Sequence, residues 1–238
     1  MNKCRKINET IVDTIDPLSK EEIAGGMNLI CDFDQMKRDL LAIYDKKVER
    51  WLQAMDLYDH GITEHTLRVT ALSIYLAQGM NFSNTELEYI QYGTLLHDIG
   101  KLGIPEKIMQ KPGKLTPYEF QIVQQHPVYA HEWLIHKSDL QPAKVIPLFH
   151  HERWDGSGYP YGLKGNEIPK LARVVAVVDV WDAITSDRPY RKAMNEDQAV
   201  SLILSKSGTH FDPEVVDTFM QLELHNTQAI SLNFPICV

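Results

Sequence analysis

Apolar residues recur every three or four positions along most of the chain, which is the spacing of helices with one buried face. The pattern predicts one helix over residues 63–80 and a second that runs from Ser83 to about His97, which Gly100 is well placed to end. Ser83 and Glu86 have the spacing of a capping box, which favours a helix start at this point. In the first helix His65 falls on the apolar stripe, so its side chain is predicted to point inward.

The next helix is predicted to begin after Thr116, because Pro117 suits the first helical position and Glu119 completes a second capping box. Phe120 and His126 lie on one face of this helix, together with other apolar residues. The pattern therefore directs both side chains into the interior.

Two predicted helices flank the adjacent histidines His150 and His151. One begins at Pro142 and carries the pair at its end, and the other spans residues 169–184. The second holds the most apolar run of the chain, immediately before Asp179. Its β-branched residues would also suit a buried strand, but no second strand candidate exists to pair with it. We therefore predict a buried helix, in which Asp179 needs a partner because an unpaired buried carboxylate is costly.

With a closing helix over residues 213–222, the predicted fold class is all-α. We expect a multi-helix bundle at 59–225, an N-terminal helical extension at 1–58 and a C-terminal tail at 226–238. Within the extension, apolar residues keep a helical spacing from about Asp34 to Tyr58. This helix either packs on the core or acts as a signalling or dimerising helix that joins a partner chain, which would make a homodimer.

Composition narrows the classes of function. The formal net charge of -8 argues against a nucleic-acid polymer as partner, although local cations could still hold a phosphate substrate. The three cysteines form no CxxC pair, which favours a reducing compartment without disulfides or a thiolate zinc site. The N-terminus has no signal-peptide pattern, and no apolar run approaches the length of a membrane span. We therefore expect a cytoplasmic protein that is not inserted in a membrane.

A set of inward-facing polar residues comes from five predicted helices. Its members are His65, His97, Asp98, His126, His150, His151 and Asp179. Each alone could be a hydrogen-bonded core residue, but uncompensated burial of all of them would cost roughly several kcal/mol or more. Divalent metal would remove this cost, because imidazole and carboxylate are good ligands for iron, manganese, nickel or zinc. Seven ligands exceed one ordinary site, so a bridging carboxylate would divide them between two ions of a buried di-metal site.

Motifs in a fixed order then give the chain a resemblance to a known family. They are His97-Asp98-Ile99-Gly100-Lys101, Lys111-Pro112-Gly113-Lys114-Leu115-Thr116, His126-Pro127, His150-His151-Glu152-Arg153-Trp154-Asp155-Gly156-Ser157-Gly158-Tyr159-Pro160, Asp179-Val180-Trp181-Asp182-Ala183-Ile184-Thr185-Ser186-Asp187-Arg188-Pro189-Tyr190-Arg191 and His210-Phe211-Asp212-Pro213. Across residues 65–213 the chain resembles the HD-GYP domain, the bacterial phosphodiesterase branch of the HD superfamily. The resemblance implies an all-helical HD-type bundle that hydrolyses cyclic di-GMP.

The resemblance also implies how the ligands divide. One ion would be held by His65, His97, Asp98 and Asp179, and the other by Asp98, His126, His150 and His151. Iron or manganese is preferred, with nickel, zinc, cobalt or magnesium as alternatives. A hydroxide that bridges the two ions would attack phosphorus. Some members carry a glutamate four residues before the first ligand histidine, where it supports a third ion. Here that position is Gly61, and the neighbouring Glu64 would point away from the site on a helix, so we predict two ions.

Three cations and a tyrosine are expected to meet the substrate. Lys101 would join Asp98 as a catalytic residue by stabilising the attacked phosphate or the departing 3′-oxygen. Arg188 and Arg191 match family positions that hold substrate phosphate, and Tyr159 in the Gly-Tyr-Pro loop would line the pocket. The expected product is linear pGpG, with GMP after a second cut as an alternative.

Two other functions stay open from the sequence. The same metal site could act on another cyclic dinucleotide or on a nucleotide, because a fold does not fix a substrate. Alternatively, the domain could be a non-catalytic signalling module that binds a nucleotide or a partner protein. The intact ligand set favours an enzyme.

Overall fold

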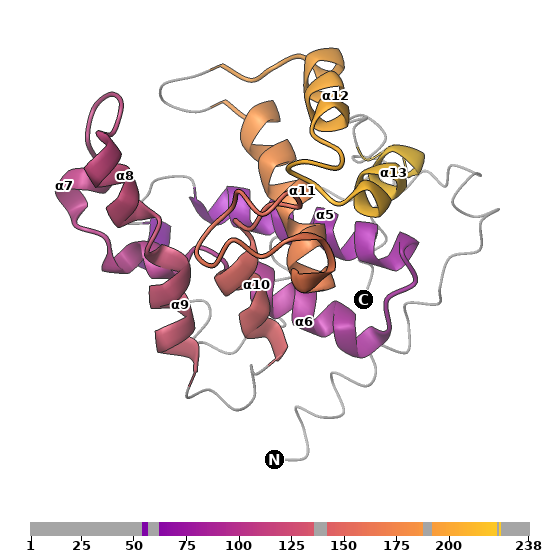
Figure 1. Cartoon of the computed structure of the whole chain (residues 1–238), viewed down its shortest axis with the longest axis horizontal. Helices are drawn as coiled ribbons and strands as arrows, with labels where there is room; N and C mark the ends of the chain where they lie inside the picture. The colour runs from indigo at the N-terminus through magenta and orange to yellow at the C-terminus, as the bar shows by residue number, and fades with distance from the viewer. Residues whose placement is uncertain (1–53, 57–61, 136–141, 188–191, 223, 225–238) are drawn as a thin grey trace. The chain divides into compact units, whose positions relative to one another are not determined.

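The computed structural model describes residues 54–56, 62–135, 142–187, 192–222 and 224. Its helices, labelled as in Figure 1, are α5 (Ile62–Gly79), α6 (Asn84–Leu95), η1 (Ile99–Gly103), α7 (Glu106–Met109), α8 (Pro117–Val123), α9 (His126–Leu134), η3 (Pro142–Lys144), α10 (Val145–Phe149), η4 (Gly165–Glu167), α11 (Lys170–Thr185), α12 (Glu196–Ser205) and α13 (Pro213–Gln221). Among these residues there is no strand, only an isolated bridge between Ser207 and Phe211. The all-α prediction is confirmed.

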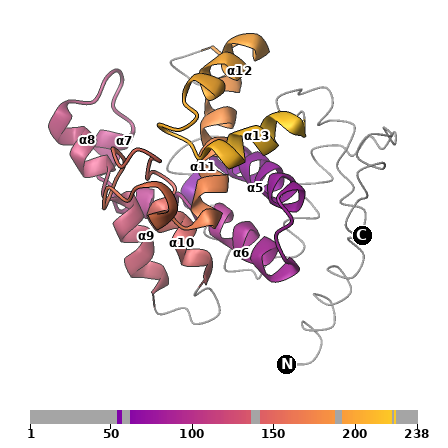
Figure 2. The same ribbon diagram turned by 45° about the vertical axis from the view of Figure 1, so that its right-hand side comes forward.

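Helix α11 is the centre of the bundle. It packs against α5, α6, α10, α12 and α13, and Figures 1 and 2 both show it running between these neighbours. Residues 174–178 are all buried, as is Trp181, which meets Phe219 of α13 with ring centroids 5.3 Å apart. A helix that is apolar on all sides needs neighbours on all sides. The apolar run is thus a helix, as predicted, and the strand alternative is wrong.

Helices α5 and α6 follow the sequence pattern closely. The predicted capping box at the start of α6 is present: Ser83 Oγ accepts a hydrogen bond from the backbone N–H of Glu86, whose carboxylate accepts one from the N–H of Ser83. The helix ends at Leu95, two residues before His97, and the chain then turns into η1. This early end places His97 and Asp98 in the connection between the two helices.

The helix predicted after Thr116 is in fact two helices. Its capping box is formed, but α8 ends at Val123 and α9 begins at His126. Pro127 explains the break, because it has no N–H to donate to the carbonyl four residues earlier, that of Val123. The break turns the two segments, so that His126 is buried whereas Phe120 is 48% exposed. The inward prediction is wrong for Phe120.

The predicted extension at 1–58 and the tail at 226–238 lie outside the described residues, except for a helical segment at 54–56. The domain boundaries and the dimerising or signalling helix therefore stay predictions. Among the described residues no helix is long and apolar enough to cross a membrane.

Candidate metal centre

The turn between α6 and η1 places His97 and Asp98 at the centre of the cluster. Both side chains are buried, and Asp98 stands immediately before the first residue of η1. The turn lies directly on the backbone of α9, because Gly100 has no Cβ: an added Cβ would fall 1.9 Å from the carbonyl oxygen of His126. Gly100 was expected to end α6, but its place is inside η1. It allows the close approach that brings Asp98 to His126.

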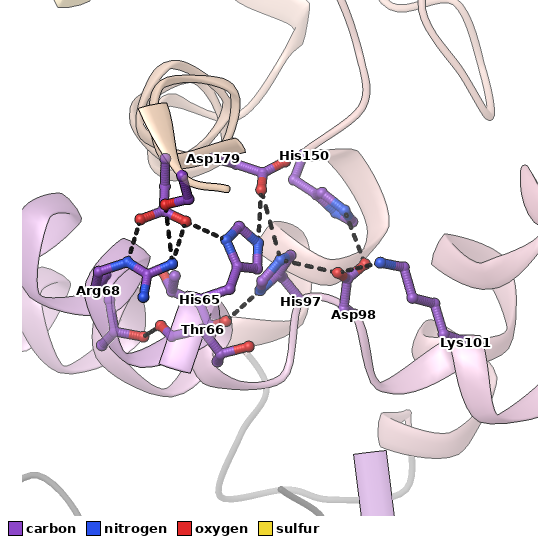
Figure 3. Close-up of polar contacts among 12 residues, drawn as sticks. His65, Thr66, Arg68, His97, Asp98, Lys101, His150 and Asp179 are labelled. Atoms are coloured by element: carbon purple, nitrogen blue, oxygen red, sulfur yellow. Dashed lines mark hydrogen bonds and ion pairs between the residues drawn. The ribbon is translucent and has the colours of Figure 1, made fainter. Parts of the chain in front are cut away.

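The other members of the predicted set come from four more helices. His65 lies on α5, His126 is the first residue of α9, and Asp179 lies on α11. His150 caps the C-terminus of α10 and His151 follows it. The structure brings all seven residues together in the interior of the bundle, and Figure 3 shows five of them side by side.

Ligand atoms gather in two groups that share Asp98. His65, His97 and Asp98 form one group and Asp98, His126, His150 and His151 the other, each with its ligand atoms within 4.8 Å of one another. Asp179 adjoins the first group, since its Oδ1 lies 3.1 Å from Nε2 of His65 and 3.9 Å from Nε2 of His97. We call the first group with Asp179 the first half-site, and the other group the second half-site.

Most of the imidazole rings are oriented by the main chain. Nδ1 of His97 lies 2.6 Å from the carbonyl of Thr94, that of His126 lies 2.8 Å from the carbonyl of Val123, and that of His150 lies 3.0 Å from the carbonyl of Pro147. The Val123 carbonyl is the one that Pro127 cannot use. A carbonyl only accepts hydrogen bonds, so each Nδ1 carries the proton and each Nε2 presents a lone pair when the ring is neutral.

Electrostatics favour the protonation states that bind metal. Burial lowers the pKa of His126 and His150, and it lowers that of His151 to about 3. Burial alone would raise the pKa of Asp98, but the positive charge of Lys101 holds it well below its usual range. The second half-site therefore combines three neutral imidazoles with an ionised carboxylate.

His65 and Asp179 form a different kind of pair. Burial alone would lower the pKa of His65, but hydrogen bonds to Asp179 and Asp182 raise it to about 9. Burial likewise opposes ionisation of Asp179, and the hydrogen bond from His65 holds its pKa far below the usual range. The costly carboxylate that the sequence placed inside an apolar helix thus has its partner.

Two contacts test whether these residues fit a metal. The Nε2 atoms of His126 and His150 lie 3.4 Å apart, although each is an acceptor in its neutral ring. Nε2 of His97 is buried without a hydrogen-bond partner among the described residues, 3.3 Å from Asp98 Oδ2. Facing lone pairs and orphaned acceptors are unfavourable unless a cation lies between them. The cluster fits divalent metal binding.

The residues expected to meet substrate are only partly visible. Nζ of Lys101 lies 2.7 Å from Asp98 Oδ2, so a cation borders the cluster (Figure 3). The ring of Tyr159 stacks on that of His151 with centroids 4.8 Å apart. Arg188 and Arg191 lie outside the described residues, and so does Gly61. Glu64 is exposed, which agrees with its predicted direction away from the site.

A buried glutamate holds the loop that carries Tyr159. The carboxylate of Glu152 accepts hydrogen bonds from the backbone N–H groups of Tyr161, Gly162 and Leu163, at 2.7, 3.1 and 3.0 Å. Gly158 lies on the preceding backbone, where an added Cβ would be 2.4 Å from the nitrogen of Arg153. The carboxylate of Glu152 and the close backbone contact at Gly158 therefore hold the loop in place.

Sequence reasoning missed Glu152 and also an ion pair, Arg68–Asp182, that touches His65. Asp182 Oδ2 lies 2.7 Å from Nδ1 of His65. A signal existed: Arg68 follows His65 by three residues and Asp182 follows Asp179 by three, so each lies one helical turn beyond a member of the cluster. For Glu152 the only signal was its place next to the histidine pair.

Known proteins that are similar to this chain include cyclic di-GMP phosphodiesterases. The HD domain family matches residues 39–215. A cyclic di-GMP phosphodiesterase of Thermotoga maritima is 47% identical over 67% of this chain and 44% of its own length. The cyclic di-GMP phosphodiesterase response regulator RpfG of Xanthomonas campestris is 38% identical over 85% of this chain and 51% of its own length. The chain thus spans about half the length of these relatives.

Solved structures share the fold. An HDG"Y"P protein from Bdellovibrio bacteriovorus matches with a TM-score of 0.57 at 20% identity, over 92% of this chain and 68% of that one. The HD domain of the L. monocytogenes phosphodiesterase PgpH, in complex with cyclic-di-AMP, matches with a TM-score of 0.53 at 16% identity, over 79% of this chain and 100% of that one. Family match, sequence relatives and fold agree: the chain belongs to the HD domain family, in its HD-GYP branch.

Proposed function

We propose that this chain is a metal-dependent phosphodiesterase that hydrolyses cyclic di-GMP to linear pGpG, with GMP after a second cut as the alternative end point. The observation that carries the proposal is the pair of ligand groups that share Asp98. A shared carboxylate suits two neighbouring ions, and paired ions are a recurrent arrangement for attack on a phosphate ester. The names of the relatives from Thermotoga maritima and Xanthomonas campestris supply the substrate.

In this proposal each half-site holds one ion. The first ion is bound by His65, His97, Asp98 and Asp179, and the second by Asp98, His126, His150 and His151. Iron or manganese suits this mixture of imidazole and carboxylate, and nickel, zinc, cobalt and magnesium are the alternatives. When bound, such ions lower the pKa of a water and offset negative charge on phosphoryl oxygens.

The protein's own side chains would do the rest. Asp98 and the main-chain carbonyls behind His97, His126 and His150 fix the ligand directions before the substrate arrives, so little reorganisation is needed. Lys101 would donate a hydrogen bond to the attacked phosphate or the departing 3′-oxygen from its place beside Asp98. Tyr159 would line the pocket wall from its stack on His151, and Arg188 and Arg191 would hold phosphate oxygens.

A second candidate is hydrolysis of another cyclic dinucleotide. It is favoured by a Vibrio cholerae relative named 3'3'-cGAMP-specific phosphodiesterase 2, which is 33% identical over 82% of this chain and 37% of its own length. The metal ligands act at the phosphate and do not contact the bases. The metal centre itself therefore does not discriminate between the two cyclic dinucleotides. A panel of cyclic di-GMP, 3'3'-cGAMP, cyclic di-AMP and a nucleotide monoester, compared by kcat/KM, separates them.

The test of the main proposal is turnover of cyclic di-GMP by anaerobically purified protein, with metal content measured on the same sample and products identified by chromatography. Turnover with about two ions per chain is expected. Tight binding of unhydrolysed nucleotide by metal-replete protein would instead identify a non-catalytic signalling module. A metal-free preparation is first restored with iron or manganese before its activity is compared.

A further inference from the structure

An ion pair stands behind His65, one helical turn beyond the cluster. Helices α5 and α11 pack against each other. His65 and Arg68 lie three residues apart on α5, and Asp179 and Asp182 lie three residues apart on α11. Residues at this spacing share a helix face, so the two pairs meet across the contact. His65 faces Asp179 (Figure 3), and both His65 and Arg68 face Asp182.

The guanidinium of Arg68 grips Asp182 with two hydrogen bonds. Nε donates to Oδ1 at 2.6 Å and Nη2 donates to Oδ2 at 2.9 Å, while Nη2 also reaches Ser186 Oγ at 3.1 Å. The Asp182 side chain is buried, and that of Arg68 is 33% exposed. A two-point grip of this kind fixes the plane of the carboxylate, which a lysine could not do.

The fixed carboxylate in turn fixes the imidazole. Asp182 Oδ2 accepts a hydrogen bond from Nδ1 of His65 at 2.7 Å, and this leaves Nε2 directed at Asp179 Oδ1, 3.1 Å away in the first half-site. A carboxylate behind a metal-binding histidine sets its tautomer and raises its basicity as a ligand. By contrast, Nδ1 of His126 and Nδ1 of His150 in the second half-site lie within hydrogen-bond distance of main-chain carbonyls.

We propose that Arg68 and Asp182 are positioning residues that raise the metal affinity of the first half-site and leave that of the second half-site unchanged. The inference rests on the proposed metal centre. It adds that different residues support the two ions, so the binding of one ion can be weakened without a substitution of any of its ligands.

The test uses Asp182→Asn, which keeps the shape of the side chain and removes its charge. We expect roughly 10–100-fold weaker binding of one Mn²⁺ per chain, with the other ion unaffected. Binding is followed by chelator competition, by metal content after dialysis and by the electron paramagnetic resonance signal of coupled Mn²⁺, none of which depends on turnover. Arg68→Lys keeps the charge but loses the two-point grip, so a smaller weakening of the same ion is expected.

The matched control is Asp212→Asn. Asp212 is as buried as Asp182, at 4% against 3% exposure, and it pairs with Arg173 of the same helix α11. Its hydrogen bonds go to Arg173 and to the backbone N–H of Glu214, neither of which belongs to the cluster, and asparagine can keep the cap on α13. Both ions should bind this variant with wild-type affinity.

The outcomes separate the inference from the proposed function. Wild-type protein that binds no divalent ion would overturn both. If wild type binds two ions and Asp182→Asn binds both equally well, or loses both together, the inference is wrong and the metal centre stands. Equal loss in Asp182→Asn and Asp212→Asn would also overturn it, because general destabilisation would then explain the effect.

Discussion

The two half-sites use the same kinds of ligand, and both contain a histidine oriented by a backbone carbonyl, but they differ in how His65 of the first half-site is held. In the first half-site His65 is oriented by a buried carboxylate that an arginine grips in turn. In the second half-site His126, at the start of α9, and His150, at the end of α10, are each oriented by a backbone carbonyl. Asp98 belongs to both.

This difference decides which changes each half-site can tolerate. A carbonyl behind a histidine cannot be removed by a side-chain substitution, so the second half-site depends on how closely the backbones pack. A carboxylate can be removed, so the first half-site depends on a chain of side chains that spans α5 and α11. Substitutions should therefore act on one half-site at a time, except at Asp98.

The largest effect is expected from Asp98→Ala, which removes the shared ligand. Both ions should bind weakly, and cyclic di-GMP turnover should fall roughly a thousand-fold or more, since several kcal/mol of metal-assisted stabilisation is lost. Turnover and metal content are measured on protein whose helix content matches wild type by circular dichroism. Unchanged turnover would contradict the proposed function.

Substitutions of one ligand from each half-site should divide the metal content. His65→Ala and His150→Ala are each expected to leave about one ion per chain and to lower turnover by about 100-fold or more, because a direct ligand matters more than a residue behind it. Addition of Asp182→Asn distinguishes the two: it should change metal binding little in His65→Ala and markedly in His150→Ala. Equal effects in both backgrounds would show that the half-sites are not separate.

The sequence predicted the helices that carry this site better than the side-chain contacts between those helices. Hydrophobic spacing placed a helix over 63–80, close to α5, and directed His65 inward, because a helix face is a local property. The inward-facing positions of the predicted helices gave the seven residues that the structure brings together, and the resemblance to a family divided them between two ions. Their assignment as ligands stays a prediction.

What the sequence did not reveal depends on contacts between helices. The pairing of Arg68 with Asp182 joins positions 114 residues apart, and the three-residue spacing from His65 places Arg68 on the right helix face without identifying its partner. Gly100 was expected to end a helix, whereas its function is to admit the carbonyl of His126, which belongs to another helix. The misplaced Phe120 had a local cause, Pro127, whose effect on the hydrogen bonds four residues earlier was not taken into account.

Gly100→Ala should disturb the backbone contact behind the second half-site. The new Cβ would meet the His126 carbonyl at 1.9 Å, so η1 and α9 must separate, at a cost of about 1–3 kcal/mol in the free energy of unfolding. Urea unfolding measures the cost, and metal titration should show weaker binding. Gly113→Ala is the control, because its Cβ meets nothing within 4 Å. Alanine is disfavoured at the φ of 100° that Gly113 adopts, so this variant should lose some stability, but it should keep both ions.

Glu152→Gln should loosen the loop beside the second half-site by a similar or smaller amount. An amide cannot accept from three N–H groups as well as a carboxylate does, and its own NH₂ would face one of them, which costs about 1–3 kcal/mol. Unfolding in urea gives the cost. Since Tyr159 stacks on His151 from this loop, KM for cyclic di-GMP should rise more than metal affinity falls. A fall in metal affinity with KM unchanged would assign Glu152 to the metal rather than to the loop.

The smallest effect is expected from His210, whose imidazole lies outside both half-sites. Its titration gives the baseline against which the stability of half-site variants can be compared at acid pH. Burial lowers the pKa of His210 to about 4, whereas in the unfolded chain it stays near the ordinary histidine value of about 6.5. Between these values the unfolded state binds the extra proton, so the free energy of unfolding falls as pH drops from about 6.5 to about 4. The difference between wild type and His210→Gln, measured by urea unfolding, should shrink over this window and stay constant above pH 7. The same slope should persist when both proteins also carry Asp98→Ala, because burial, and not Asp98, sets the pKa of His210. A slope that vanished with Asp98→Ala would show that the acid response belongs to the half-sites instead.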